Sequence, residues 1–185
     1  KYYIWFIYKN MSILKVAKIG HPVLYKKANK VEKIPDLSIN KLINDMSETM
    51  LDAKGIGLAA PQVHISKQII IFRNPELEDN EKKLIEITVL INPKILNFSK
   101  ETENDWEGCL SIPGLSGLVK RHSKITYEGL DLNGNIIKRE AEGLHARVVQ
   151  HEIDHLMGLV YLNRLADNRA FGFESEIQEY WKKNG

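Results

Sequence analysis

The pattern of apolar and polar positions predicts a helix in the first third of the chain. Between residues 37 and 51, apolar residues recur three or four positions apart and so share one face of a helix. Asp36 or Ser38 lies at the start of this run, where a short polar side chain can accept hydrogen bonds from free backbone amides. Gly55 follows the run and is expected to end the helix in the left-handed conformation.

Two further helices and several strands are expected after this one. One helix is predicted from about residue 142 to residue 157, ending near Gly158, and the last lies within residues 173–183. β-Branched and apolar runs predict strands at 68–72, 84–92 and 124–132, and Asn133-Gly134 predicts a type I′ hairpin turn before Ile136 and Ile137. Helices and strands do not alternate strictly, which indicates the α+β class rather than a doubly wound sheet.

The length and composition are typical of one globular domain. No repeat or low-complexity linker divides the 185 residues, so a single domain is expected over residues 12–185. Residues 1–11 are interpreted as a leader remnant or an extension, and residues 74–83 as a polar surface loop or insertion. The net charge of +2 gives no argument for nucleic acid or an anionic membrane. No apolar stretch reaches the roughly 20 residues that span a bilayer.

The most informative motif is His151-Glu152-Ile153-Asp154-His155, inside the second predicted helix. Residues four apart stack on one helix face, so both histidine rings can bind one metal ion. Glu152 projects beside them, where a glutamate can take a proton from water at the metal. A catalytic site of this kind needs a third protein ligand and one open position.

The third ligand has several candidates. A histidine six residues after His155 would indicate a metzincin, but Tyr161 occupies that position, which argues against this class. A thermolysin-like site would use a downstream glutamate, and Glu174 and Glu176 are available. The chain's single cysteine, Cys109, is the other candidate and excludes an intrachain disulfide. These residues alone leave the choice open, since a lone cysteine is often a small buried apolar residue.

A third segment makes the assignment of an enzyme class more specific. Residues 55–62 read Gly-Ile-Gly-Leu-Ala-Ala-Pro-Gln, where small residues permit close approach of the backbone to a ligand. Together with Glu-Gly-Cys-Leu-Ser at 107–111 and Gln-His-Glu-Ile-Asp-His at 150–155, this segment resembles the three motifs of the peptide deformylase family, in the family's order. Broader similarity runs from about residue 13 to residue 162 and includes residues 20–24, whereas residues 1–11 and 74–83 fall outside it.

The resemblance implies a fold, a reaction and a site. The fold would have antiparallel β-sheets packed around a central metal-binding helix, with an N-terminal and a C-terminal helix. The reaction would be removal of the N-formyl group from the starting methionine of new polypeptides, with release of formate. The implied metal ligands are Cys109, His151 and His155. Such donors suit a divalent ion; the resemblance favours Fe²⁺, and Zn²⁺, Co²⁺ or Ni²⁺ can substitute.

Three more residues take catalytic roles by resemblance. Glu152 would act as general base, and donors at the formyl oxygen would be the side-chain amide of Gln62 and the backbone N–H of Leu110. Substrate contacts are expected at Ile56 and Gly57 of the small-residue segment.

Leu144 and Val148 share a helix face with His151 and are expected to form an apolar pocket wall for the methionine side chain. Arg147 departs from the apolar residue common at that position, so it must extend outward or pair with an acid. Either arrangement affects the pocket that selects methionine.

The remaining polar residues near the motifs have open roles. Asp154 is expected to form a structural ion pair, and Glu107 is either structural or a partner of the metal ligands. Arg121 either reaches a substrate backbone or is a solvated strand charge. The other histidines, which are His21, His64, His122 and His145, lack partners at ligand spacing and are interpreted as non-catalytic.

Two alternative functions stay open, and the resemblance also implies partners and a cellular compartment. A thermolysin-like peptidase is the competing enzyme class, and a non-catalytic relative that binds formylated peptides is the third interpretation. The expected partners are N-formylmethionyl peptides and nascent chains near the ribosome, without direct nucleic-acid or membrane binding. A plastid, apicoplast or mitochondrial compartment is favoured over a bacterial cytoplasm. The sequence does not decide the oligomeric state or whether the C-terminal segment docks on ribosomes.

Overall fold

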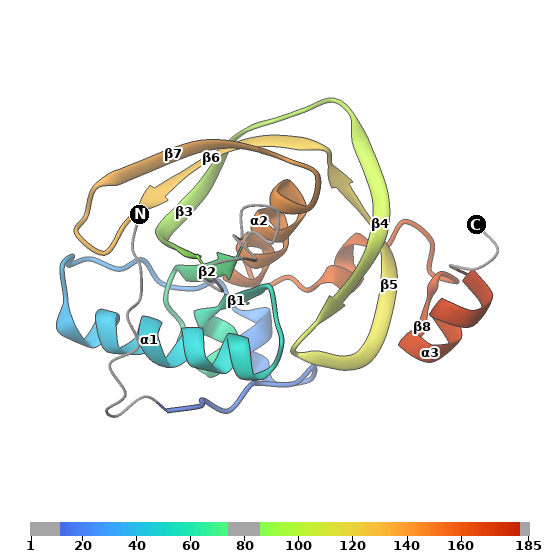
Figure 1. Ribbon diagram of the computed structural model, residues 1–185, viewed down its shortest axis with the longest axis horizontal. Coiled ribbons are helices and arrows are strands. Elements are labelled where there is room, and N and C mark those ends of the chain that lie inside the picture. The colour runs from blue at the N-terminus through green and yellow to red at the C-terminus, as the bar shows by residue number, and fades with distance from the viewer. Residues whose placement is uncertain (1–11, 74–85, 182–185) are drawn as a thin grey trace, which may run out of the picture.

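The computed structural model describes residues 12–73 and 86–181, and it has two antiparallel sheets and a helix between them (Figure 1). The first sheet has the order β1-β2-β3-β6-β7, with bounds Gly57–Ala59, Ile69–Arg73, Ile87–Phe98, Lys124–Leu130 and Ile136–Glu142. The second has the order β4-β5-β8, with bounds Thr102–Cys109, Ile112–His122 and Phe171–Phe173. The helices are α1 (Leu37–Asp52), α2 (Gly143–Leu156) and α3 (Glu174–Glu176).

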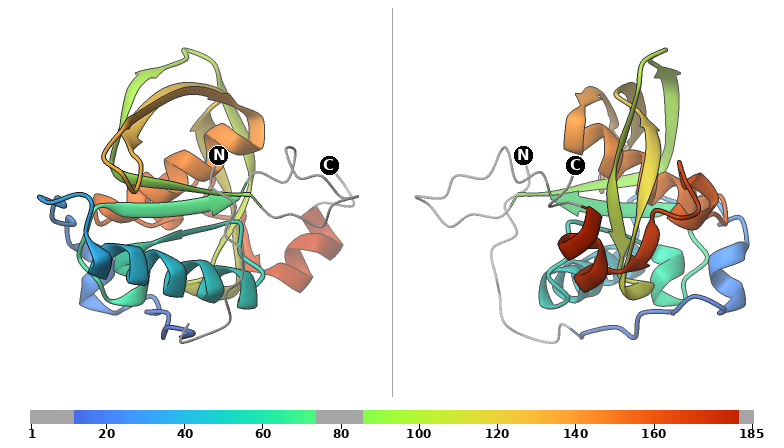
Figure 2. Two further views of the ribbon diagram at one scale, coloured as in Figure 1. Left: turned by 60° about the vertical axis from the view of Figure 1, so that its left-hand side comes forward. Right: turned by 90° about the vertical axis from the view of Figure 1, so that its right-hand side faces the viewer.

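Helices cover both faces of the first sheet, which explains why β2 is an uninterrupted apolar run. Along a strand, successive side chains point to opposite faces. Ile69 and Ile71 accordingly lie in the apolar cluster with α1, whereas Ile70 and Phe72 lie in the cluster with α2. Figure 2 shows the resulting layers, with α1 on one side of the sheet and α2 on the other.

The helix α2 also contacts β5 of the second sheet, so it lies between the two sheets. This arrangement confirms the expected α+β fold, in which antiparallel sheets surround a central helix. A short C-terminal helix is present as well, since α3 continues into a π-helical turn, Ile177–Trp181. In the described residues, no helix is long and apolar enough to cross a bilayer.

The start of α1 matches its prediction and its end does not. Asp36 is the N-cap and accepts a hydrogen bond from the Ser38 amide at 2.7 Å. At the other end, Lys54 rather than Gly55 takes the left-handed conformation, with φ of 54°. The amide of Gly55 donates to the carbonyl of Met50 at 2.8 Å, which makes Gly55 the second residue of a Schellman motif.

The hairpin between β6 and β7 is present, but the predicted type I′ turn is wrong. A type I′ turn needs positive φ at both central residues, and of Asn133 and Gly134 only Gly134 has one, at 84°. The carboxylate of Asp131 accepts hydrogen bonds from the amides of Asn133 and Asn135, both at 2.8 Å. These bonds stabilise a longer connection, residues 131–135, between the end of β6 and the start of β7.

Two other expectations are refined by the structure. The segment after Gly55 is not only a turn, because β1 forms there and pairs with β2. The strand predicted at 84–92 continues to Phe98 as β3. The expectations for residues 1–11 and 74–83 lie outside the described residues.

The left-handed Lys54 predicts a stability difference between two variants. Lys54→Gly and Lys54→Ala both remove the charge, but alanine keeps a Cβ that disfavours positive φ. We expect the glycine variant to be more stable by about 1 kcal/mol, equivalent to a Tm higher by roughly 2–4 °C for a domain of this size. Thermal unfolding followed by circular dichroism measures the difference, and equal Tm values would contradict the prediction.

Candidate metal centre

The structure brings the cysteine and two histidines of the separate motifs together. His151 and His155 lie one turn apart on α2, and Cys109 is the last residue of β4. The Cys109 Sγ atom lies 3.3 Å from Nε2 of His155. One ligand atom from each of the three residues lies within 4.8 Å of the other two. This geometry, a thiolate and two imidazoles, fits a single divalent metal ion.

Glu152 lies beside these residues with an unsatisfied carboxylate oxygen. Its side chain is buried, and its Oε2 atom has no hydrogen-bond partner among the described residues. A buried unpaired oxygen is costly, so water or a substrate is the expected partner. Burial raises the pKa of Glu152 to about 7. A Cβ added at Gly57 would overlap the Glu152 carboxylate, which explains the glycine at that position of β1.

Gln62 is held in a fixed orientation at the centre. Its Oε1 atom accepts a hydrogen bond from the Ala59 amide at 2.8 Å. The Nε2 group therefore points the other way, 3.5 Å from the Cys109 Sγ and 3.2 Å from the Ser111 hydroxyl oxygen. An amide donor thus lies next to the sulfur of Cys109.

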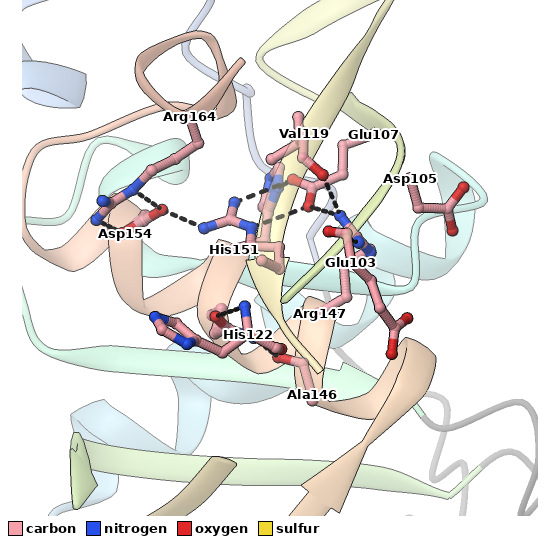
Figure 3. A network of polar contacts seen from close by, with 12 residues as sticks. Glu103, Asp105, Glu107, Val119, His122, Ala146, Arg147, His151, Asp154 and Arg164 are labelled. Atoms are coloured by element: carbon pink, nitrogen blue, oxygen red, sulfur yellow. Dashed lines mark hydrogen bonds and ion pairs between the residues drawn. The ribbon is translucent and has the colours of Figure 1, made fainter. Parts of the chain in front are cut away.

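Glu107 fixes His151 through a dense set of hydrogen bonds (Figure 3). Its Oε2 atom accepts from Nδ1 of His151 at 2.8 Å, and Arg121 donates to both carboxylate oxygens, at 2.9 and 3.0 Å. Burial alone would raise the pKa of Glu107, but hydrogen bonds from His151 and Arg121 lower it far below its usual range. The carboxylate is therefore ionised, so His151 donates through Nδ1 and leaves Nε2 for the metal.

Arg147 pairs with an acid, which is one of the two arrangements that its sequence position allowed. Its Nη1 group donates to Glu107 Oε1 at 2.9 Å and to the Val119 carbonyl at 3.0 Å. Its Nη2 group donates to the Glu103 carbonyl at 3.1 Å. One side chain of α2 is thus bonded to both β4 and β5, the hairpin that carries Cys109.

The two predictions for Arg121 are both wrong. Arg121 is 5% exposed, so it is not a solvated strand charge, and it does not border the cavity at the metal centre. Its guanidinium lies between Glu107 and Asp154, because these two buried carboxylates need compensating charge. Asp154 has the structural role expected of it, as it also pairs with Arg164 at 3.0 Å.

A cavity of about 640 Å³ opens beside the metal centre. Nine of the eleven residues predicted for the site border it, all except His155 and Arg121. They include both helix residues of the expected apolar wall, Leu144 and Val148. Within the described residues, none of the histidines interpreted as non-catalytic borders this cavity.

The structure also reveals parts of the site that the sequence analysis missed. The N-terminal arm, which contains Ala17 and Lys18, is hydrogen-bonded to the segments that carry Gln62 and Leu110. The Ala17 amide donates to the Gln62 carbonyl at 2.7 Å, and Lys18 Nζ donates to the Leu110 carbonyl at 2.8 Å. Trp106 borders the cavity as well, and so does Glu174, which the sequence suggested only as a possible metal ligand. No local motif marks Ala17, Lys18 or Trp106, since only the tertiary fold brings them to the site.

The positions of Glu174 and Glu176 test the alternative in which a glutamate is the third metal ligand. Glu174 borders the cavity and Glu176 does not, and neither belongs to the one group of potential metal ligands found in the described residues. The converging atoms therefore favour Cys109 over a thermolysin-like carboxylate.

Comparisons with known proteins agree with this geometry. The profile of the family described as polypeptide deformylase matches residues 13–170. Peptide deformylase 1 of Nitrosomonas europaea is 44% identical over 168 residues, which cover 89% of this chain and 94% of that protein. Peptide deformylase 1 of Bordetella pertussis is 48% identical over 161 residues, covering 85% and 90%.

Solved structures give the same result. The class I type b peptide deformylase from Acinetobacter baumannii, with Met-Ala-Ser bound, has a TM-score of 0.77 and 36% identity, and the match covers 84% of this chain and 100% of that one. The peptide deformylase from Plasmodium falciparum has a TM-score of 0.76 and 32% identity, with 89% and 91% covered.

The hydrogen bond between Glu107 and His151 predicts an effect on metal affinity. In Glu107→Gln the histidine loses an anionic acceptor, and Arg121 and Arg147 lose their compensating charge. We expect the dissociation constant for Zn²⁺ to rise about 10–100-fold, the usual effect of losing such a partner. Competition with a chromophoric chelator measures it. Glu103→Gln, an exposed side chain on the same strand, is the control, and equal affinities of the two variants would contradict the prediction.

Proposed function

Because this chain belongs to the polypeptide deformylase family, we propose how its own residues carry out the family's reaction. The protein is an enzyme, a metal-dependent hydrolase that removes the N-formyl group from the N-terminal methionine of newly made polypeptides. The observation that carries the assignment of roles is the convergence of Cys109, His151 and His155 beside the unpaired carboxylate oxygen of Glu152.

Cys109, His151 and His155 are proposed as the ligands of one metal ion, with Fe²⁺ favoured and Zn²⁺, Co²⁺ or Ni²⁺ also suited to these donors. A divalent ion held by these residues would supply Lewis-acid chemistry toward water and the formyl carbonyl. Cys109 and His151 border the cavity, so an ion with three protein ligands would be accessible to water and substrate from that side.

Glu152 is proposed as the general base. Its Oε2 atom has no hydrogen-bond partner among the described residues, so it is free to take a proton from the attacking water and return it to the departing amine. Negative charge develops on the formyl oxygen as water attacks. The Gln62 amide and the Leu110 backbone N–H are the proposed donors to this oxygen. The orientation of Gln62 is fixed before the substrate binds, because its Oε1 atom accepts from the Ala59 amide.

Substrate contacts are proposed on two sides of the cavity. Leu144 and Val148 form an apolar wall for the methionine side chain, and the charge of the neighbouring Arg147 is compensated by Glu107. Ile56 and Gly57 lie at β1, which is the edge strand of the first sheet, so their backbone groups can bond an extended peptide. Arg121 has no place among these contacts.

The setting of the reaction follows from its substrate. Nascent chains that begin with formyl-methionine are the proposed partners, met near the ribosome. The family is consistent with a bacterial cytoplasm, because the curated relatives described above come from bacteria. An organelle that starts translation with formyl-methionine remains our prediction from the sequence.

Glu152→Gln tests the proposed base. A glutamine keeps the shape of the side chain but cannot accept the proton, so we expect kcat on formyl-Met-Ala-Ser to fall at least about 100-fold with metal content unchanged. Formate release and metal analysis of the same preparation measure both quantities. A variant that keeps its metal and most of its turnover would exclude Glu152 as the base.

Cys109→Ser tests the third ligand against the thermolysin-like alternative. Loss of the thiolate should weaken metal binding or change the metal preference, whereas Glu174→Gln and Glu176→Gln should retain the metal of the unaltered protein. Dialysis against a chelator followed by elemental analysis compares the three variants. Retention by Cys109→Ser together with loss by either glutamate variant would favour a carboxylate ligand.

A further inference from the structure

One wall of the substrate cavity includes Glu174, which belongs to the C-terminal segment formed by residues 171–181. Its strand β8 pairs with β5, with Phe173 opposite Leu115. Glu174 directly follows this pair and borders the cavity, as do Leu115 and Trp106. Figure 1 shows the segment lying along the outer side of the β4–β5 hairpin, the same hairpin that ends in Cys109. The position of Glu174 is therefore fixed by strand pairing.

Two tryptophans extend this wall beyond the cavity. The rings of Trp106 and Trp181 meet edge to face, with centroids 5.9 Å apart and an angle of 72°. Trp181 remains 42% exposed although it is a large aromatic residue. Trp181 does not border the cavity itself, but its ring contacts Trp106, which does.

The wall carries an available negative charge. Glu174 is exposed and accepts only a long hydrogen bond of 3.3 Å, from Gln178, among the described residues. It has no ion pair within the part of the chain that the structure describes. The cations that border the same cavity come from other segments. Lys18 precedes the first helices, Lys54 follows α1, and Arg147 lies on α2, where it is paired with Glu107. An acid beside exposed aromatic faces is suited to a Lys or Arg side chain.

We propose that Trp106, Glu174 and Trp181 form a binding wall for the residues that follow formyl-methionine, and that this wall favours a basic side chain among them. The proposal rests on the proposed function. That function places the formyl group at the metal centre, so the rest of the substrate peptide must extend through the cavity toward solvent. The cavity that holds Cys109 and His151 is also bordered by Trp106 and Glu174, so an extended peptide with its formyl group at the metal centre can reach the wall with its following residues.

The test compares kcat/KM for formyl-Met-Ala-Lys and formyl-Met-Ala-Glu amides, and for the same pair with the charged residue second. We expect the unaltered enzyme to favour the lysine peptide about two- to fivefold in one of the two series, the range of an exposed ion pair. Glu174→Lys should reverse that preference. Glu176→Lys is the matched control, because it makes the same change of net charge two residues further along the chain and does not border the cavity.

The aromatic part of the wall has its own pair of variants. Trp181→Ala should reduce the preference for lysine, whereas Tyr180→Ala, which removes a neighbouring exposed aromatic residue, should leave it unchanged. Circular dichroism and metal content confirm that each variant is folded and loaded.

Several results would overturn the proposal. One is an equal change of preference in Glu174→Lys and Glu176→Lys, which would reflect net charge alone. Another is an enzyme that is dimeric in solution and becomes monomeric in Trp181→Ala, because a second copy would then occupy the wall. Failure of the proposed function is distinguishable, since it would abolish turnover of every formyl-methionyl peptide, whereas failure of this proposal leaves turnover intact and charge-independent.

Discussion

The metal centre depends on one buried carboxylate that joins the two halves of the site. Cys109 lies on the β4–β5 hairpin and the histidines lie on α2, so the ligand atoms converge only if the hairpin is docked on the helix. Glu107 secures this docking, because each of its oxygens accepts two hydrogen bonds, and their donors are Arg121, Arg147 and His151. Buried charges are tolerated when they are paired and fully hydrogen-bonded, as they are here. Specific placement of the ligands, rather than added stability, is the gain from such a network.

The helix α2 can carry this charged network because its other face is apolar. Val149 and Ala146 pack against the first sheet, whereas Glu152 and His151 face the cavity. The sheet is close enough at β1 that Gly57 has no room for a side chain beside Glu152. The chain continues from β1 into the turn that contains Gln62. The carbonyl of Gln62 accepts a hydrogen bond from the Ala17 amide of the N-terminal arm. The base and two ligands therefore lie on α2 itself, and the third ligand, Cys109, and the donor Gln62 come from other elements that are packed around this helix.

The sequence predicted the residues of the centre better than the elements that position them. The three motifs identify Cys109, His151 and Glu152, because metal ligands and a base are tied to residue type and spacing. The strand β4 was not predicted beyond its last residues, since it is largely exposed and reads Thr-Glu-Asn-Asp-Trp-Glu-Gly-Cys. Its strand conformation comes from pairing with β5, which no local pattern reveals. Arg121 was misinterpreted for a similar reason, as its two partners lie 14 and 33 residues away.

The buried part of the cavity holds the groups proposed for the hydrolysis, whereas the exposed part is proposed to select among substrate peptides. The groups proposed to react, Glu152 and Gln62, are buried and fixed by hydrogen bonds or close packing, so a substitution at either changes the reaction. The wall formed with the C-terminal segment is exposed, and Glu174 makes few contacts. Substitutions there cost the fold little. Since β8 holds this segment against β5, the wall can vary in charge and aromatic content while the metal ligands stay in place. Preference for particular nascent chains can thus change independently of the hydrolysis.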